Sequence, residues 1–211
     1  MKKNLSSDFE NRHEGYSDWE VDNIVSGSFR LFSDVHIRTR IPEEVLEQIP
    51  IWVLVRFYLE KIDIAGGLNL TETYEKVEDI ESAIARHPAA REIDFHSNRI
   101  NPALEFDVTL SSIIQFFCNE SKLTKVVKGK MFLSRKGRSL MKNGNKLLKQ
   151  LLLFFTYNTF SGEWDEFGET TTGQFGIGYS LILLNKYGDA KRSDSFYADK
   201  YFQAFPNLIE S

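Results

Sequence analysis

Residues 121–150 form a strongly basic segment, in which ten lysines and arginines occur without a single aspartate or glutamate. The basic residues are Lys122, Lys125, Lys128, Lys130, Arg135, Lys136, Arg138, Lys142, Lys146 and Lys149. The segment carries a net charge of +10 while the whole chain carries −4, so the remaining residues sum to −14. Lysine and arginine side chains neutralise phosphates without reading base sequence, so this asymmetry indicates a site for a polyanion such as a nucleic acid.

Two interpretations of the basic segment remain open from the sequence. In the first, its side chains contact nucleic-acid phosphates. The residues expected to make these contacts are Lys122, Lys125, Lys128, Lys130, Arg135, Lys136, Arg138 and Lys142. In the second, the segment faces acidic surface of the same molecule, for which the acidic residues 159–172 are a candidate partner. Net charge concerns binding partners and leaves the fold open.

Acidic residues cluster within 159–172, at Glu163, Asp165, Glu166 and Glu169. Carboxylates can hold a divalent cation, but this cluster lacks the fixed alternate ligand positions and the final glutamate of an EF-hand loop. We therefore favour a solvated loop, or an internal partner for the basic segment, over a metal site.

The stretch from Gly173 to Gly178 has glycines spaced as G-x-x-G-x-G. A dinucleotide-binding turn requires G-x-G-x-x-G between a strand and a helix, and no strand is expected before this stretch. We expect the small residues to let the final helices approach closely, and we expect no cofactor.

The remaining reactive side chains predict no catalytic residue and no metal site. The histidines are His13, His36, His87 and His96, and no pair has the spacing of helix-borne zinc ligands. Cys118 is the only cysteine, so no intrachain disulfide can form. It lies beside Phe117 on an apolar segment, which predicts a buried and inert thiol. A serine elbow of the G-x-S-x-G type is also absent from the sequence.

The elements that must position the basic side chains are a helix, a β-hairpin and a second helix within residues 108–142. Apolar residues at helical spacing predict the first helix over 109–119. Two β-prone runs around Lys128-Gly129-Lys130 predict the hairpin, and Ser134 can cap a helix that begins at Arg135. The first helix has no basic residue, and its candidates for reading base edges are Ser111, Ser112, Gln115 and Asn119. We therefore expect nonspecific nucleic-acid binding, or none, ahead of specific readout.

Residues 23–107 predict a first helical unit with some winged-helix character. Short apolar runs within residues 24–40 predict one or two strands. From Ile41 onward the expected elements are a helix start at 41–44, a helix over 51–62, an extended piece at 68–71, a helix over 72–86 capped by Thr71, and a connection at 92–107. The helix over 51–62 is apolar nearly all round, which is typical of a central helix.

The two ends of the chain differ in character. Residues 1–22 are polar and aperiodic, which predicts a loose N-terminal arm. Residues 143–211 predict C-terminal helices packed on the same core as the preceding units. Within that range Gly144 is expected to break a helix and Asn145 to start the next, and further helices are expected over 146–158, 173–187 and 194–204.

The string at residues 130–140, KMFLSRKGRSL, resembles the junction between wing and helix in winged-helix transcription regulators. A longer resemblance covers about residues 41–211. It rests on Ile-Pro-Ile-Trp at 49–52, Gly-Leu-Asn-Leu-Thr at 67–71, Leu-Ser-Arg-Lys-Gly-Arg at 133–138, Gly-Gln-Phe-Gly-Ile-Gly-Tyr at 173–179 and Phe-Tyr-Ala-Asp-Lys-Tyr-Phe-Gln-Ala-Phe-Pro at 196–206. In this order the segments resemble an uncharacterised bacterial family with two winged-helix-like units and a helical C-terminus. The resemblance implies an architecture and no catalytic residues, and after Thr71 the chain departs from the family pattern.

Together these features predict a mainly α-helical protein with winged-helix-like units, short β-hairpins and a C-terminal helical cap. The N-terminus lacks the apolar region of a signal peptide, and no segment is long and apolar enough to span a membrane, so we expect a cytoplasmic location. Three function classes follow, because a fold does not decide a function. They are a non-catalytic module that contacts nucleic-acid phosphates through residues 122–149, a protein-interaction module or scaffold, and, least favoured, an enzyme.

Overall fold

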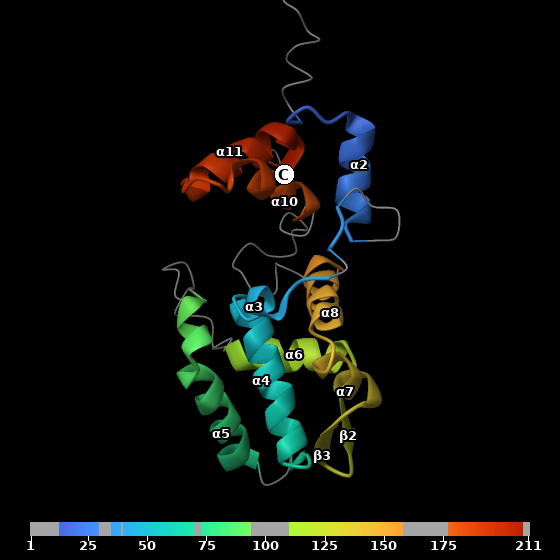
Figure 1. Ribbon diagram of the computed structural model, residues 1–211, viewed down its shortest axis with the longest axis vertical. Coiled ribbons are helices and arrows are strands. Elements are labelled where there is room, and N and C mark those ends of the chain that lie inside the picture. The colour runs from blue at the N-terminus through green and yellow to red at the C-terminus, as the bar shows by residue number, and fades with distance from the viewer. Residues whose placement is uncertain are drawn as a thin grey trace, which may run out of the picture. The chain divides into compact units, whose positions relative to one another are not determined.

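The computed structural model of the chain describes residues 13–29, 35–38, 40–69, 73–93, 110–157 and 177–208 (Figure 1). These residues are mainly helical and include a small three-stranded antiparallel sheet, which confirms the mainly α-helical class predicted from the sequence. The chain divides into two compact units, one from residues 38–158 and the other from residues 1–37 and 159–211. The acidic residues at 163–169 lie outside the described residues.

The unit of residues 38–158 alternates helices with short strands. Its elements are α3 (Glu43–Leu46), α4 (Pro50–Ile64), β1 (Leu68–Asn69), α5 (Thr73–Arg86), the 3-10 helix η1 (Pro88–Glu92), α6 (Leu110–Glu120), β2 (Thr124–Val127), β3 (Lys130–Leu133), α7 (Arg135–Met141) and α8 (Gly144–Tyr157). The helix and hairpin positions predicted for residues 41–142 agree with these bounds to within a few residues. The predicted cap Thr71 lies outside the described residues.

Helix α4 is the central helix of this unit, as its all-round apolar sequence predicts. Pro50 stands in its first turn, where a missing N–H costs nothing. Its buried side chains are Trp52, Leu54, Val55, Tyr58, Leu59 and Ile62. They join one hydrophobic cluster with residues of α5, α6, β3, α7 and α8, so a single core holds the described helices and the sheet of this unit together.

The sheet has the strand order β1-β3-β2, and both pairings are antiparallel. Strand β1 belongs to the range expected to form a first unit, yet it pairs with β3 of the hairpin, with Leu68 opposite Met131. At the hairpin tip Lys128 and Gly129 have φ values of 51° and 72°, as the two central residues of a type I′ turn require. Residues on both sides of the expected boundary at 107/108 therefore share one sheet.

The boundary between α7 and α8 differs from the sequence expectation. The backbone carbonyl and the Oδ1 of Asn143 accept N–H groups of the first turn of α8, so Gly144 is its first residue rather than a break. Asn145 does not start the helix. Its side-chain amide instead binds the backbone N–H and C=O of Ile41, at 2.7 and 3.1 Å. Gly144 permits a close contact, since a Cβ there would stand 2.9 Å from the ring of Trp52.

The second unit contains α2 (Asp18–Gly27), α10 (Ile177–Tyr187), α11 (Asp194–Ala204) and the 3-10 helix η2 (Pro206–Leu208). The expectation of a loose arm over residues 1–22 is wrong from Asp18 onward, because Ser17 and Glu20 form a capping box that starts α2. The expectation of strands within 24–40 is also wrong for the described residues, since α2 continues to Gly27 and residues 35–38 form no strand.

A separate hydrophobic cluster holds the second unit together. It consists of Val21, Ile24, Tyr179, Leu183 and Ala204. Gly178 allows α10 to approach α2, because a Cβ there would stand 2.0 Å from the Oγ of Ser28. The sequence predicts that the small residues of this stretch let the final helices approach one another. In the structure the helix that approaches Gly178 is α2. Of the stretch, only residues 177 and 178 are described.

Candidate nucleic-acid interface

The basic side chains of residues 121–150 lie at the surface of their unit. Lys130 is half-buried, and the other nine are exposed. Of these ten side chains, only Arg138 pairs with an acid among the described residues. Its Nε lies 3.4 Å from the Oδ1 of Asp63, and both side chains are too exposed for the pair to contribute much to stability. The described acidic residues therefore leave most of this charge without a partner.

The turn between α6 and β2 lies directly against the start of α7. The Oγ of Ser134 donates to the carbonyl of Lys122 at 2.7 Å, and it also accepts the N–H of Gly137, so the predicted cap is confirmed. A Cβ at Gly137 would stand 2.2 Å from the carbonyl oxygen of Leu123, so glycine is needed for this contact. Figure 1 shows α7 beside the hairpin of β2 and β3. The fold thus gathers the basic residues of the turn, the hairpin and α7.

Two lysines of this group lie close enough to affect each other. Lys136 donates from its Nζ to the carbonyl of Ser121 at 2.9 Å. Partial burial lowers the pKa of Lys136, and the positive charge of Lys122 lowers it further. A bound anion would relieve this repulsion, because it would interact favourably with both ammonium groups.

Strand β2 has a lysine with left-handed backbone conformation on each side. Lys122 has φ of 56° and Lys128 has φ of 51°. This region costs an ordinary L-residue about 1 kcal/mol or more, whereas glycine and asparagine enter it readily. Both side chains are exposed. The chain therefore places long cationic side chains at two positions where other residues would fold more easily.

The sheet has one face turned to the core and one turned outward. Thr124, Met131 and Leu133 are buried, and the hydroxyl of Tyr58 on α4 donates to the sulfur of Met131 at 3.4 Å. Since side chains alternate along a strand, the opposite face carries Lys125, Val127, Lys130 and Phe132, which we name the outer face. Basic side chains thus stand on the outer face as well as at the hairpin tip.

Helix α6 offers few groups for reading base edges. Ser111 is buried, and Ser112 and Gln115 are half-buried. Asn119 is exposed, but its Oδ1 accepts the hydroxyl of Thr124 at 2.6 Å. Cys118 on the same helix is a buried free thiol, as predicted, and burial raises its pKa. The helix before the hairpin therefore serves mainly the core.

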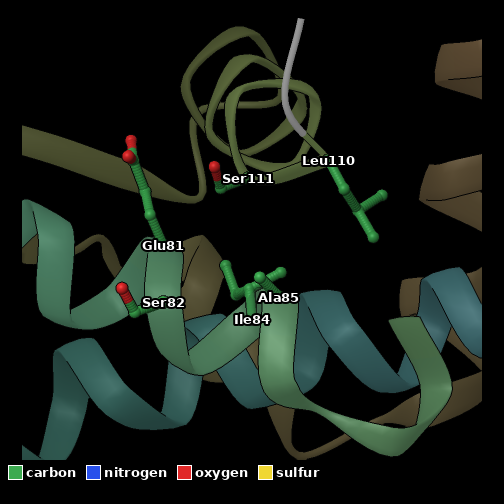
Figure 2. Close-up of a pocket in the computed structure, with 6 residues that line it drawn as sticks. All are labelled: Glu81, Ser82, Ile84, Ala85, Leu110 and Ser111. Atoms are coloured by element: carbon green, nitrogen blue, oxygen red, sulfur yellow. The ribbon is translucent and has the colours of Figure 1, made fainter. Parts of the chain in front are cut away.

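A cavity of about 250 Å³ lies between α5 and α6 (Figure 2). Its lining residues are Glu81, Ser82, Ile84, Ala85, Leu110 and Ser111. Figure 2 shows the carboxylate of Glu81 and the hydroxyl of Ser111 on one side of the space, with the apolar side chains of Ile84 and Leu110 on the other. The lining residues that the structure describes include no histidine, the side chain that most often activates a serine nucleophile.

A buried carboxylate that the sequence did not point to stands in the second unit. The side chain of Glu14 is only 5% exposed and accepts hydrogen bonds from Lys186, Lys200 and Tyr187. Burial by itself would raise its pKa, but the hydrogen bonds from the two ammonium groups and the phenol outweigh burial and lower the pKa to about 2. Beside it, His13 contacts the carbonyl of Ala204 and the carboxylate of Asp18. These contacts tie residues 13 and 14 to α10 and α11.

The described residues contain no group of three or more histidine, cysteine, aspartate or glutamate side chains arranged to hold a metal ion. His87 caps η1, where its Nδ1 accepts the N–H of Ala89 at 3.2 Å, and His36 is exposed. His96 lies outside the described ranges. No helix within those ranges is long and apolar enough to cross a bilayer.

Comparison of the chain with protein-family models, curated protein sequences and solved structures finds no match. The resemblance to an uncharacterised bacterial family therefore stays an expectation from the sequence.

Proposed function

We propose that residues 38–158 form a winged-helix-like, non-catalytic module that binds nucleic-acid phosphates without reading base sequence. The observation that carries the proposal is the exposure of the basic residues around the hairpin without acidic partners among the described residues. Phosphate contacts of this kind are made mainly by lysine and arginine and supply the affinity of nonspecific binding.

The order of elements supports the winged-helix part of the proposal. Helix α4, strand β1, helices α5 and α6, and strands β2 and β3 follow one another, with β1 beside β3. In a winged-helix module the last two strands form the wing and the helix before them is the recognition helix. By this correspondence the basic hairpin is the wing and α6 stands at the place of the recognition helix.

The same correspondence explains why we propose nonspecific binding. A recognition helix presents donors and acceptors to base edges. Helix α6 has no lysine or arginine, and it buries Ile114, Phe117 and Cys118. A protein-interaction role for the same surface stays the alternative, and it is favoured if the charges prove irrelevant to nucleic-acid binding.

A salt titration of binding to generic duplex DNA tests the proposal. If about five of the lysines and arginines contact phosphates, the logarithm of the affinity falls by about 4 to 5 per tenfold increase in salt. The double variant Lys122→Asn with Lys128→Asn removes two charges at left-handed positions that asparagine tolerates. We expect it to weaken binding and to reduce the salt slope by about 2.

The single variant Lys191→Asn is a matched control, because Lys191 is exposed in the other unit. It removes a lysine charge without touching the hairpin, so affinity and slope should stay at the wild-type values. Absence of binding to any nucleic acid by the wild type at low salt, or binding that salt leaves unchanged, would contradict the proposal.

A further inference from the structure

Phe132 is an aromatic side chain on the outer face of the sheet, where a solvated strand position more often carries a polar residue. Lys125 stands opposite Phe132 and Val127 opposite Lys130, so the ring has cationic side chains on its own strand and on the neighbouring one. Lys125 and Val127 are exposed, while Phe132 is half-buried. The face is therefore open to solvent around a partly covered ring.

The ring is held in place by the backbone of Gly67. A Cβ at Gly67 would stand 2.7 Å from both Cδ1 and Cε1 of Phe132, so the ring lies directly against this glycine. Gly67 immediately precedes β1, and covering a glycine beside a sheet needs only an apolar side chain of similar size. The contact also fixes the ring, and a fixed ring loses little entropy when a ligand stacks on it.

Covering Gly67 requires an apolar side chain but does not explain why cationic side chains surround the ring. The Nζ of Lys130 lies 5.4 Å from the centre of the Phe132 ring, within the range of a cation–π contact. Lys128 stands at the hairpin tip two residues before Lys130. A flat ring beside several ammonium groups is the combination that binds single-stranded nucleic acids, in which bases stack on the ring and phosphates pair with the lysines.

We propose that the outer face binds single-stranded nucleic acid, with an unpaired base stacked on Phe132 and the adjacent phosphates paired with Lys125 and Lys130. The proposal rests on the phosphate-binding function above and adds a substrate class to it. In a duplex the bases are stacked on one another. The phosphates of a duplex can therefore pair with the lysines, but its bases cannot stack on the ring. The incoming base takes the place of the Lys130 ammonium, which then becomes free to meet a phosphate.

Replacement of the ring tests this proposal against binding of both forms of nucleic acid. We expect Phe132→Leu, which keeps an apolar cover on Gly67, to weaken binding of oligo(dT) by about tenfold. Duplex binding by the same variant should stay at the wild-type value, because only phosphate contacts remain in use. Phe132→Tyr keeps a ring for stacking and should bind oligo(dT) as the wild type does.

Phe57→Leu is the matched control. Phe57 is also a half-buried ring of this unit with a lysine over it, since the Nζ of Lys61 lies 5.1 Å from its centre, but it stands on α4. This variant should bind oligo(dT) normally. Phe132→Trp allows a measurement that does not depend on the leucine variant, because stacking of a base should quench the fluorescence of the new indole.

The outcomes separate this proposal from the one on which it rests. The stacking proposal is overturned, while phosphate binding stands, if Phe132→Leu changes oligo(dT) and duplex binding equally or changes neither. It is also overturned if Phe57→Leu weakens oligo(dT) binding as much as Phe132→Leu does. If bound oligo(dT) leaves the indole fluorescence of Phe132→Trp unquenched, the stacking proposal is also overturned. If the wild type binds neither nucleic acid at low salt, the phosphate-binding function itself fails.

Discussion

At the scale of single residues, backbone conformation and burial show what the residue type alone does not. Lys128 occupies the first central position of a type I′ turn, where asparagine is strongly preferred. Glu14 keeps its charge although its side chain is almost fully covered. Each of these residues makes a measurable contribution to the stability of the protein, and the sign of that contribution follows from the surroundings of the residue.

We expect Lys128→Asn to stabilise the protein by about 0.5–1 kcal/mol, because asparagine adopts the left-handed conformation at lower cost. Thermal or urea unfolding followed by circular dichroism measures the change. Lys125→Asn is the control, since it makes the same substitution within β2, where asparagine is disfavoured. It should leave stability unchanged or lower it. A loss of stability with Lys128→Asn would show that the lysine side chain has a structural role.

Glu14 predicts a pH dependence of stability with a definite sign. Its pKa is about 2 in the folded protein and near 4.5 for an unperturbed glutamate, so its ionised form favours folding. The stabilisation is fully present above about pH 4.5, and it is lost as the pH falls from there toward 2. A shift of this size corresponds to a free energy on the order of 3 kcal/mol.

Glu14→Gln should therefore lower stability at neutral pH and flatten the acid limb of the stability curve between about pH 4.5 and 2. Urea unfolding at several pH values measures both effects. Asp22→Asn, at an exposed position of α2, is the control and should leave the curve close to that of the wild type. An unchanged acid limb in Glu14→Gln would contradict the assignment.

At the scale of elements, the close contact between α7 and the turn before β2 decides how the basic group is assembled. Gly137 lies inside α7, where alanine would ordinarily be favoured by about 1 kcal/mol over glycine. The contact with Leu123 reverses this preference, because an added Cβ has no room.

We expect Gly137→Ala to destabilise the protein by more than about 1 kcal/mol, since either α7 or the turn must move. Gly27→Ala is the matched control at the last residue of α2, where an added Cβ meets nothing within 4 Å. That variant should be neutral or slightly stabilising. Chemical denaturation of both proteins measures the difference, and a stabilised Gly137→Ala variant would show that the contact is looser than the structure places it.

At the scale of the whole molecule, two hydrophobic clusters stabilise two units. One contains Phe117, Leu151 and the side chains of α4, and the other contains Ile24 and Leu183. Units with separate cores can open separately, because the loss of packing in one removes no buried contact from the other.

Leu183→Ala should therefore speed amide hydrogen exchange in α2, α10 and α11 and leave α4, α6 and α8 at their wild-type rates. Leu151→Ala is the reciprocal variant and should affect the helices of residues 38–158. Mass spectrometry of hydrogen exchange resolves the two sets of helices. Faster exchange in all helices after either substitution would show that the two cores open together.

The sequence determined the local elements of residues 41–142 and the charge of the candidate site. Periodicity marked α4 and α6, the turn residues marked the hairpin, and Ser134 marked the start of α7, because these signals act between neighbours in the chain. The list of basic residues needed only residue types. The capping box of Ser17 and Glu20 is also a signal between neighbours, but the residues around it are polar and aperiodic, so the sequence predicts no helix there.

Only the tertiary structure decided which elements meet. The pairing of β1 with β3, the contact of Gly178 with α2, the burial of Glu14 and the position of Phe132 against Gly67 all join residues far apart in the chain. No local propensity specifies such contacts, since they follow from how whole faces pack. The basic segment at 121–150 was thus visible as charge in the sequence, and folding around one core decided which of its side chains stand together.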